Sequence, residues 1–201
     1  AQYYYHALGI MRPGDKAPAA QADLLPGMII LQDDNNDNKI GKEDMHYIGN
    51  GAPKLTFGFN NAFRYKNWDL SFYFYGETGR KRAESYKEKW IRTSGDNVSV
   101  LSYKSFNHNN TASDYPTYLF GGQNFGDYFV KSVYYIRCGN INLGYNIPVN
   151  KIKWMQRCRV YADVTNPFVI TNWTGVDPET DNGEFAYPNI ISYNFGVNIT
   201  F

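Results

Sequence analysis

The sequence has 201 residues, enough for one domain with a core of its own. Its formal net charge is +1, so neither an acidic nor a basic excess indicates a nucleic-acid partner. Aromatic residues make up 17% of the chain, a composition that favours β-strands over helices. No apolar run approaches the roughly 18 residues of a transmembrane helix, so we expect no helical membrane span.

The N-terminal sequence has no start Met and lacks the basic and apolar regions of a signal peptide. We therefore expect the chain to be an internal or processed part of a longer protein. Residues 1–53 are expected to be irregular, because Pro and Gly interrupt them and an Asp/Asn-rich loop occupies 33–44.

The loop at 33–44 is similar to a calcium loop of the EF-hand type. Counting from its first residue, oxygen donors fall at positions 1, 3, 5 and 12, and a backbone carbonyl is available at position 7. These residues are Asp33, Asn35, Asp37, Asp44 and, for the carbonyl, Lys39. The sixth residue is Asn rather than the usual Gly, and the twelfth is Asp rather than Glu. The alternative is a loop held by side-chain-to-backbone hydrogen bonds without a metal.

Two stretches with alternating apolar residues, 54–65 and 68–77, predict antiparallel strands. Only Lys66-Asn67 separates them, which predicts a tight hairpin. The side chains expected on the apolar face are Leu55, Phe57, Phe59, Phe63 and Tyr65 in the first stretch and Trp68, Leu70, Phe72 and Phe74 in the second.

Three further strands are predicted at 129–147, 157–166 and 191–201. The last has apolar residues at every odd position and small or polar residues at every even one. The connections are a long polar segment at 78–127 with a short helix near 82–92, a turn at 149–155, and a long loop at 167–189.

The connections alternate between short and long, as in an outer-membrane β-barrel with short periplasmic turns and long extracellular loops. Bacterial barrels need at least about eight strands to close, so five strands must complete a sheet supplied by other residues. The fold class predicted is therefore all-β, an antiparallel transmembrane β-barrel segment comprising residues 54–201, with long extracellular loops.

Several short sequence motifs, in this order and spacing, resemble the C-terminal end of SusC-like (SusC/RagA) TonB-dependent outer-membrane transporters. They are Ile48-Gly49-Asn50, Phe57-Gly58-Phe59-Asn60-Asn61, Tyr135-Ile136-Arg137, Leu143-Gly144-Tyr145, Thr174-Gly175-Val176-Asp177-Pro178-Glu179, Tyr187-Pro188 and Phe195-Gly196 followed by Phe201.

This resemblance implies about five C-terminal strands of a roughly 22-stranded barrel that imports oligosaccharides or peptides. It implies a SusD-like surface lipoprotein as lid, and TonB, ExbB and ExbD acting through an N-terminal part absent from this sequence. The remaining partners would be outer-membrane lipid and the rest of the barrel and its plug. By resemblance to other barrels, the aromatic residues Tyr193, Phe195 and Phe201 would serve as an assembly signal.

Charged residues expected on the polar face could line a substrate path or pair across neighbouring strands. They are Arg64, Asp69, Arg159 and Asp163. Aromatic residues of the long loops could contact sugars or peptides, or pack within the loops. They are Tyr103, Phe106, Tyr115, Tyr118, Phe120, Phe125, Tyr128, Trp173, Phe185 and Tyr187.

We predict no enzyme, because the three histidines are scattered and no nucleophile elbow, zinc-protease or phosphate-loop motif occurs. The alternative to a transporter component is a soluble all-β carbohydrate-binding module with a calcium loop. Such a module would cover the alternating apolar residues with a second sheet.

Overall fold

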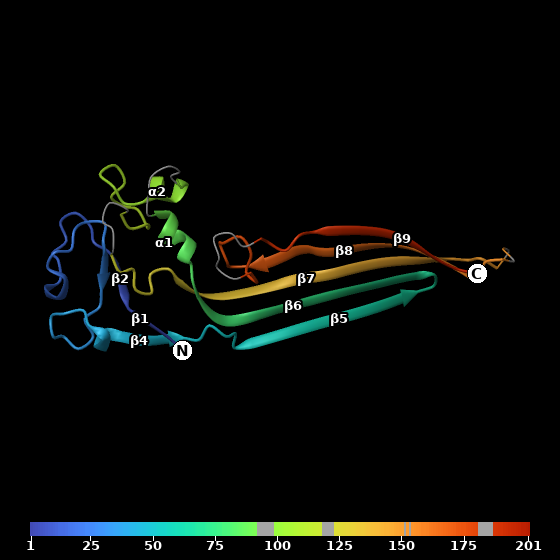
Figure 1. Cartoon of the computed structure of the whole chain (residues 1–201), viewed down its shortest axis with the longest axis horizontal. Coiled ribbons are helices and arrows are strands. Elements are labelled where there is room, and N and C mark those ends of the chain that lie inside the picture. Colours follow the sequence, from blue (N-terminus) through green and yellow to red (C-terminus); the bar gives the residue numbers. More distant parts are fainter. Residues whose placement is uncertain (92–98, 118–122, 151, 153, 181–186) are drawn as a thin grey trace. The chain divides into compact units, whose positions relative to one another are not determined.

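Alternating apolar and polar residues produce the main element of the structure, a five-stranded sheet in the order β5-β6-β7-β8-β9 (Figure 1). The computed structural model describes residues 1–201 except 92–98, 118–122, 151, 153 and 181–186. The strands of this sheet are β5 (Leu55–Tyr65), β6 (Trp68–Ala83), β7 (Val130–Ile147), β8 (Arg157–Thr171) and β9 (Ser192–Thr200).

Two smaller antiparallel sheets of two strands each lie outside the main sheet. They pair β1 with β4 and β2 with β3, so residues predicted to be irregular contain short strands. The bounds are β1 (Gln2–Tyr5), β2 (Ala7–Ile10), β3 (Ile29–Leu31) and β4 (Met45–Gly49). The helices are α1 (Ser85–Ile91) and α2 (Val100–Lys104), with 3-10 turns at Ala19–Gln21 and Lys42–Asp44. No described helix has the length and apolar character needed to cross a bilayer.

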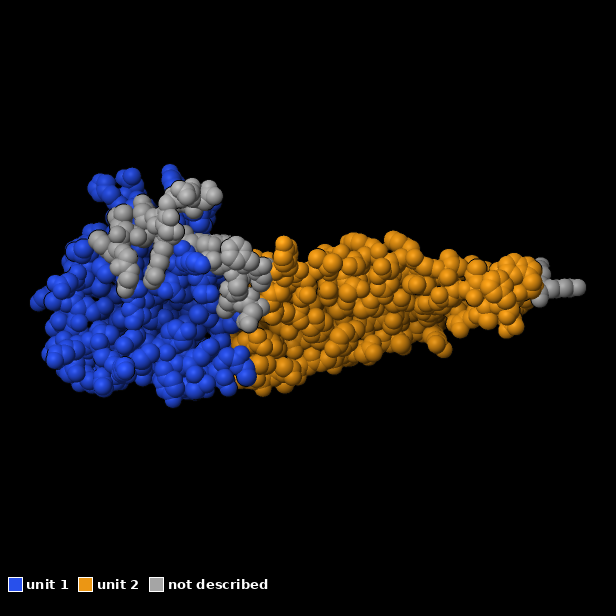
Figure 2. All heavy atoms as spheres, in the orientation of Figure 1, with its two compact units in different colours: residues 1–52, 81–132, 182–184 blue, residues 53–80, 133–181, 185–201 orange. Residues whose placement is uncertain are grey.

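The chain divides into two compact units, coloured separately in Figure 2. Unit 1 contains the described residues of 1–52 and 81–132, and unit 2 those of 53–80, 133–181 and 185–201. The sequence predicted a boundary after residue 53 and a loop over 78–127. In the structure, most of that loop packs with the first 52 residues.

Unit 1 has an apolar core. Its buried members come from β2, β3 and the segments that follow α2, so residues distant in sequence share one cluster. They are Ile10, Ile29, Leu31, Phe106, Phe125 and Phe129, with Tyr5, Ala7, Ile40, Leu101, Tyr115 and Tyr128 packed against them. Removal of this apolar surface from water, the hydrophobic effect, stabilises unit 1.

Unit 2 has an apolar face but does not cover it. The predicted hairpin is present, with Phe59 opposite Phe74 and Phe63 opposite Leu70, and Lys66 turns the chain with a positive φ of 53°. On this face the large side chains remain exposed, and the described part of unit 2 contains no second sheet. The exposed side chains are Leu55, Phe57, Phe59, Phe63, Trp68, Leu143, Ile147, Phe168, Ile170, Tyr193, Phe195, Val197 and Ile199.

Three features of the sheet differ from the sequence prediction. Strand β6 was expected to end at 77 but continues to Ala83. Strand β8 was expected to end at 166 but continues to Thr171, because its pairing with β7 resumes beyond Asn166, which adopts a φ of 52°. The register shifts between Cys138 and Asn140, so the regular alternation predicted for 129–147 is interrupted there. Both cysteines are free thiols.

Candidate functional site

The polar face of the five-stranded sheet carries an ion pair near the end of the sheet where β6 and β8 begin. Asp69 on β6 and Arg159 on β8 are in direct contact, and Arg159 Nε donates to Asp69 Oδ1 at 3.0 Å. Asn146 on β7 donates to the same Asp69 oxygen at 3.1 Å. Arg159 also donates to Asn142 Oδ1 at 2.7 Å. Of the four charges predicted on this face, Asp69 and Arg159 therefore pair with each other, across the intervening strand β7.

A second carboxylate continues the polar network toward β9. Asp163 accepts hydrogen bonds from Asn140 at 2.6 Å and from Asn142 at 3.3 Å. Asn194 on β9 reaches the other oxygen of Asp163 at 3.5 Å. The network therefore spans β6 to β9, and its side chains hold one another in place across four strands.

An open, polar-lined concavity lies on this face beside the ion pair. Four of its nine lining residues are cationic, and Asp69 is the one acidic member. The lining residues are Arg64, Lys66, Trp68, Asp69, Asn146, Arg157, Arg159, Asn198 and Thr200. Three of the four charged residues predicted on the polar face, all except Asp163, meet here or at its rim. The surface suits a polar solute rather than an apolar one.

A buried charge cluster ties the loop after β8 to the sheet, and the sequence reasoning did not single it out as a site. Arg137 is 3% exposed and donates to both oxygens of Asp177, at 2.8 and 2.9 Å. Its Nε lies 2.6 Å from Glu179 Oε2, and Tyr135 donates to the other Glu179 oxygen at 3.2 Å. Removing one member would leave a buried charge unpaired, so the cluster locks the described part of this loop.

The carboxylate of Asp177 is stabilised in its charged form. Burial raises the pKa of Asp177, but N–H groups of Glu179 and Asn189 and the charge of Arg137 outweigh this, and the net pKa lies below its usual value. The motif residues Tyr135, Arg137, Asp177 and Glu179 were visible in the sequence. Only the fold shows that they meet.

The Asp/Asn-rich loop in unit 1 is held by its own hydrogen bonds. Asp33 accepts from the N–H of Asp37 and of Asn38, and Asn35 accepts from the N–H of Asp37 at 2.9 Å. Asp37 in turn accepts from the N–H of Lys39 at 2.8 Å. Asn38 has the left-handed backbone conformation, with φ 63°, that a Gly usually takes at this position. The oxygen donors of positions 1, 3 and 5 therefore point into the loop.

The twelfth residue of the loop, Asp44, is buried and fully engaged. One carboxylate oxygen accepts from the N–H of Asp34 and of Asn35, and the other from the N–H of Gly41. The Gly41 hydrogen bond, although opposed by burial, lowers the pKa of Asp44, and the other two N–H groups lower it further. Asp44 thus closes the loop as an anionic cap for backbone N–H groups.

Five of the loop aromatics are packed within the structure, as the second of the two predicted roles requires. Phe106, Phe125, Tyr115 and Tyr128 belong to or pack against the core of unit 1, and Trp173 in unit 2 is buried. Tyr103 and Tyr187 are exposed. The remaining three, Tyr118, Phe120 and Phe185, lie outside the described residues.

The three aromatic residues predicted as an assembly signal, Tyr193, Phe195 and Phe201, are all exposed. Tyr193 and Phe195 lie on the apolar face of β9, and the Phe201 ring stacks on Trp154 with centroids 5.7 Å apart.

Comparison with known proteins identifies relatives over nearly the whole chain. TonB-dependent receptor P3 of Formosa agariphila is 26% identical over 218 residues, covering 99% of this chain and 22% of the relative. TonB-dependent receptor SusC of Bacteroides thetaiotaomicron is 29% identical over 180 residues, covering 84% of this chain and 17% of the relative. The chain is SusC-like.

The fold agrees with this SusC-like sequence. The structure of the RagAB peptide transporter matches with a TM-score of 0.77 at 20% identity, covering 99% of this chain and 22% of that one. No family model matches the chain. The SusC-like chain spans about a fifth of the length of the curated relatives it matches. It is an outer-membrane protein, and its antiparallel sheet is of the transmembrane β-barrel class.

Proposed function

We propose that this SusC-like chain forms part of the barrel wall and outer loops of a TonB-dependent importer of oligosaccharides or peptides. The observation that carries the proposal is the two-faced sheet of unit 2. One face exposes large apolar side chains, and the other carries a hydrogen-bonded ionic network. A barrel wall needs this arrangement, because one face meets lipid and the other meets water and solute.

The polar face would provide a water-filled path in which Asp69 and Arg159 are paired rather than isolated charges. Asp69 and Arg159 satisfy each other, and the asparagines around them offer hydrogen-bonding groups to a passing solute. The cationic rim beside them, with Arg64, Lys66 and Arg157, would favour solutes that carry hydroxyl, carbonyl or carboxylate groups. Oligosaccharides and peptides both fit this description.

The partners proposed are a SusD-like lipoprotein at the outer surface and TonB, ExbB and ExbD as the source of energy. The names of the relatives support the second point, since they are TonB-dependent receptors. We assign the chain no catalytic activity.

The test is uptake by cells of the native host. We expect deletion of the gene to abolish growth on, and uptake of, one class of labelled oligosaccharide or peptide, and dissipation of the proton gradient to do the same in the wild type. Unchanged uptake of every substrate in a broad panel of both classes would contradict the proposal. The class that is lost identifies the substrate.

Calcium remains part of the proposal as a ligand of the loop at 33–44. Asp33, Asn35 and Asp37 supply side-chain oxygens within five residues, which is the donor chemistry that Ca²⁺ prefers, and Asp44 holds the loop closed around them. We expect Ca²⁺, but not an equal concentration of Mg²⁺, to raise the thermal midpoint of unit 1. Asp33→Asn should remove this response, and an identical response in the variant would refute the site.

The exposed terminal aromatics are proposed to act in barrel assembly. Removal of Phe201 should lower the amount of folded protein in the outer membrane, whereas Trp154→Phe, which keeps a ring under Phe201, should not. Surface labelling of both variants measures this, and a normal level in the Phe201 deletion would count against the role.

A further inference from the structure

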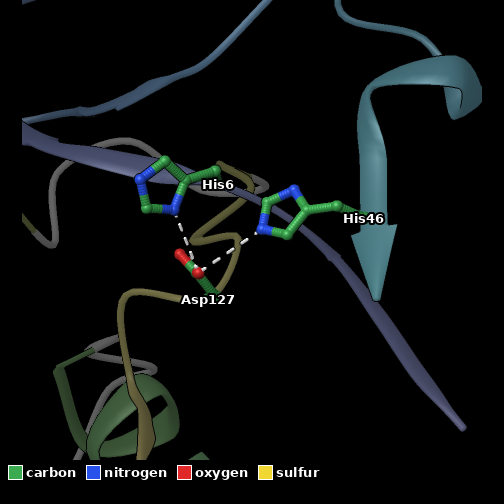
Figure 3. A group of neighbouring side chains, drawn as sticks. All are labelled: His6, His46 and Asp127. Carbon is green, nitrogen blue, oxygen red and sulfur yellow. Dashed lines mark hydrogen bonds and ion pairs between the residues drawn. The ribbon is translucent and has the colours of Figure 1, made fainter. Parts of the chain in front are cut away.

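Two of the three histidines, scattered in the sequence, meet in unit 1. His6 lies between β1 and β2, and His46 lies on β4, which pairs with β1 so that Tyr4 is opposite His46. Asp127 belongs to the turn that precedes β7. In Figure 3 both imidazole rings point toward the Asp127 carboxylate from different elements.

The distances among these side chains suit one shared ion. His6 Nδ1 lies 3.2 Å from Asp127 Oδ2, and His46 Nε2 lies 3.9 Å from the same oxygen. One ligand atom from each residue lies within 4.8 Å of the other two. Ligand atoms around a tetrahedral zinc, with bonds of about 2.1 Å, are about 3.4 Å apart. Small rotations of the partly exposed rings would therefore bring three of the four ligands of a tetrahedral ion into place, with water as the fourth.

The Asp127 carboxylate is fixed in the orientation that such a site requires. Its Oδ1 accepts from the N–H of Ala7 at 2.8 Å, and its own N–H donates to the Tyr5 carbonyl at 2.9 Å. The preceding Gly126 has φ 53°, and a Cβ atom there would lie 2.5 Å from the Tyr5 carbonyl oxygen. The backbone on both sides of His6 thus holds Asp127, and Oδ2 remains directed at the imidazoles.

A second carboxylate stands behind one of the imidazoles. Asp34 Oδ2 lies 3.8 Å from His46 Nδ1, the nitrogen that does not face Asp127. The two atoms are too far apart for a hydrogen bond, but the carboxylate lies on the side of the ring from which an outer partner orients a metal-bound histidine. The side chains of His6, His46 and Asp127 are 46%, 36% and 21% exposed, so an ion and a water ligand can reach the site.

We propose that His6, His46 and Asp127 bind a divalent transition-metal ion of the Zn²⁺ class and so clamp the β1–β2 turn, β4 and the turn before β7 together. Two imidazoles and one carboxylate suit Zn²⁺, Co²⁺, Ni²⁺ or Cu²⁺, whereas Ca²⁺ and Mg²⁺ prefer oxygen ligands throughout. The three proposed ligands lie outside the oxygen-only loop at 33–44, although Asp34 of that loop lies beside His46. It does not depend on what the importer carries.

The test uses the complete outer-membrane complex, purified in detergent, stripped with a chelator and titrated with Zn²⁺ alone. We expect His6→Gln and His46→Gln each to weaken binding of one Zn²⁺ by at least about tenfold. His108→Gln is the matched control, because His108 is exposed and lies apart from the cluster in the bridge between Asn107 and Asn110. Equal zinc affinity and stoichiometry in all four proteins would overturn the site.

A second measurement needs no variant. Co²⁺ added to the stripped wild-type complex should produce the visible absorption of a low-coordinate nitrogen–oxygen site, and Zn²⁺ but not excess Ca²⁺ should displace it. Absence of any zinc-displaceable Co²⁺ absorption would refute the proposal even if the histidine variants failed to assemble.

Discussion

The two units of this chain use the same kinds of apolar side chain in opposite ways. In unit 1, Ile29 and Phe125 are buried in a core assembled from distant segments. In unit 2, Phe63 and Phe195 are exposed on one face of a sheet, and Phe195 is 81% exposed. Only unit 1 therefore resembles a domain folded against water.

The difference shows that an apolar side chain indicates a core only when something covers it. Uncovered apolar patches on soluble monomers rarely exceed a few hundred Å². The exposed apolar face of unit 2 involves all five strands, and we therefore expect it to meet lipid. Substitutions of similar chemistry should consequently have opposite consequences in the two units.

The largest effect on stability is expected from removing a large side chain from the core of unit 1. Phe125→Ala should destabilise unit 1 by about 3–5 kcal/mol, because it removes a buried ring and leaves a cavity. Tyr103→Ala, at an exposed aromatic of the same unit, should change stability by less than about 0.5 kcal/mol. Hydrogen exchange of the backbone amides in β2 and β3 measures the loss of stability in both variants. An equal loss of protection in the two would contradict the assignment of Phe125 to the core and Tyr103 to the surface.

A charge placed on the apolar face of unit 2 should destabilise the protein nearly as much. Phe195→Arg places a cation on the exposed apolar face of β9 and should cost about 2–4 kcal/mol in a bilayer. Asn194→Arg is the matched variant, since its side chain faces Asp163 on the other side of the same strand. Unfolding in lipid vesicles measures the two costs. A soluble sandwich would instead show the Phe195→Arg penalty in detergent-free buffer.

The ion pair on the polar face should contribute less. In a double-mutant cycle of Asp69→Asn and Arg159→Gln, we expect a coupling free energy of about 1 kcal/mol, because the pair is partly solvated and shared with Asn142 and Asn146. Full additivity of the two substitutions would show that the pair does not act as a unit.

The smallest effect concerns the loop of unit 1 at low pH. Since N–H groups lower the pKa of Asp44 in the folded state, its stabilising effect is complete above the unfolded value of about 3.9. It is lost as the pH falls further, through the folded pKa. Asp44→Asn should therefore flatten the stability of unit 1 between pH 5 and about 3. Asp37→Asn, at an exposed position, is the control, and parallel pH profiles of wild type and Asp44→Asn would contradict the assignment.

Much of unit 2 could be predicted because successive side chains of a strand point to opposite faces. A strand with one apolar face therefore shows apolar and polar residues in alternation. The hairpin at Lys66-Asn67, the apolar face of β5 and β6, and the strand ending near Phe201 all follow from local patterns. The extension of β8 past Asn166 could not be predicted from the local pattern. Asn-Pro at 166–167 is a local signal for the end of a strand, but pairing with β7 outweighs it.

Unit 1 was largely beyond prediction. Its strands are only three to five residues long, too short to show a period, and its core joins Ile29 to Phe125 across nearly a hundred positions.

The sequence by itself determined the class of this protein, since alternation, connection lengths and motif order are local properties that survive without knowledge of contacts. Only the tertiary structure decided which charges meet: Asp69 with Arg159, Arg137 with Asp177, and His6 with His46 at Asp127. The reason is physical. Local patterns and turns set the register of a hairpin, but the partner of a side chain in a distant segment depends on how those segments pack, which no local pattern encodes.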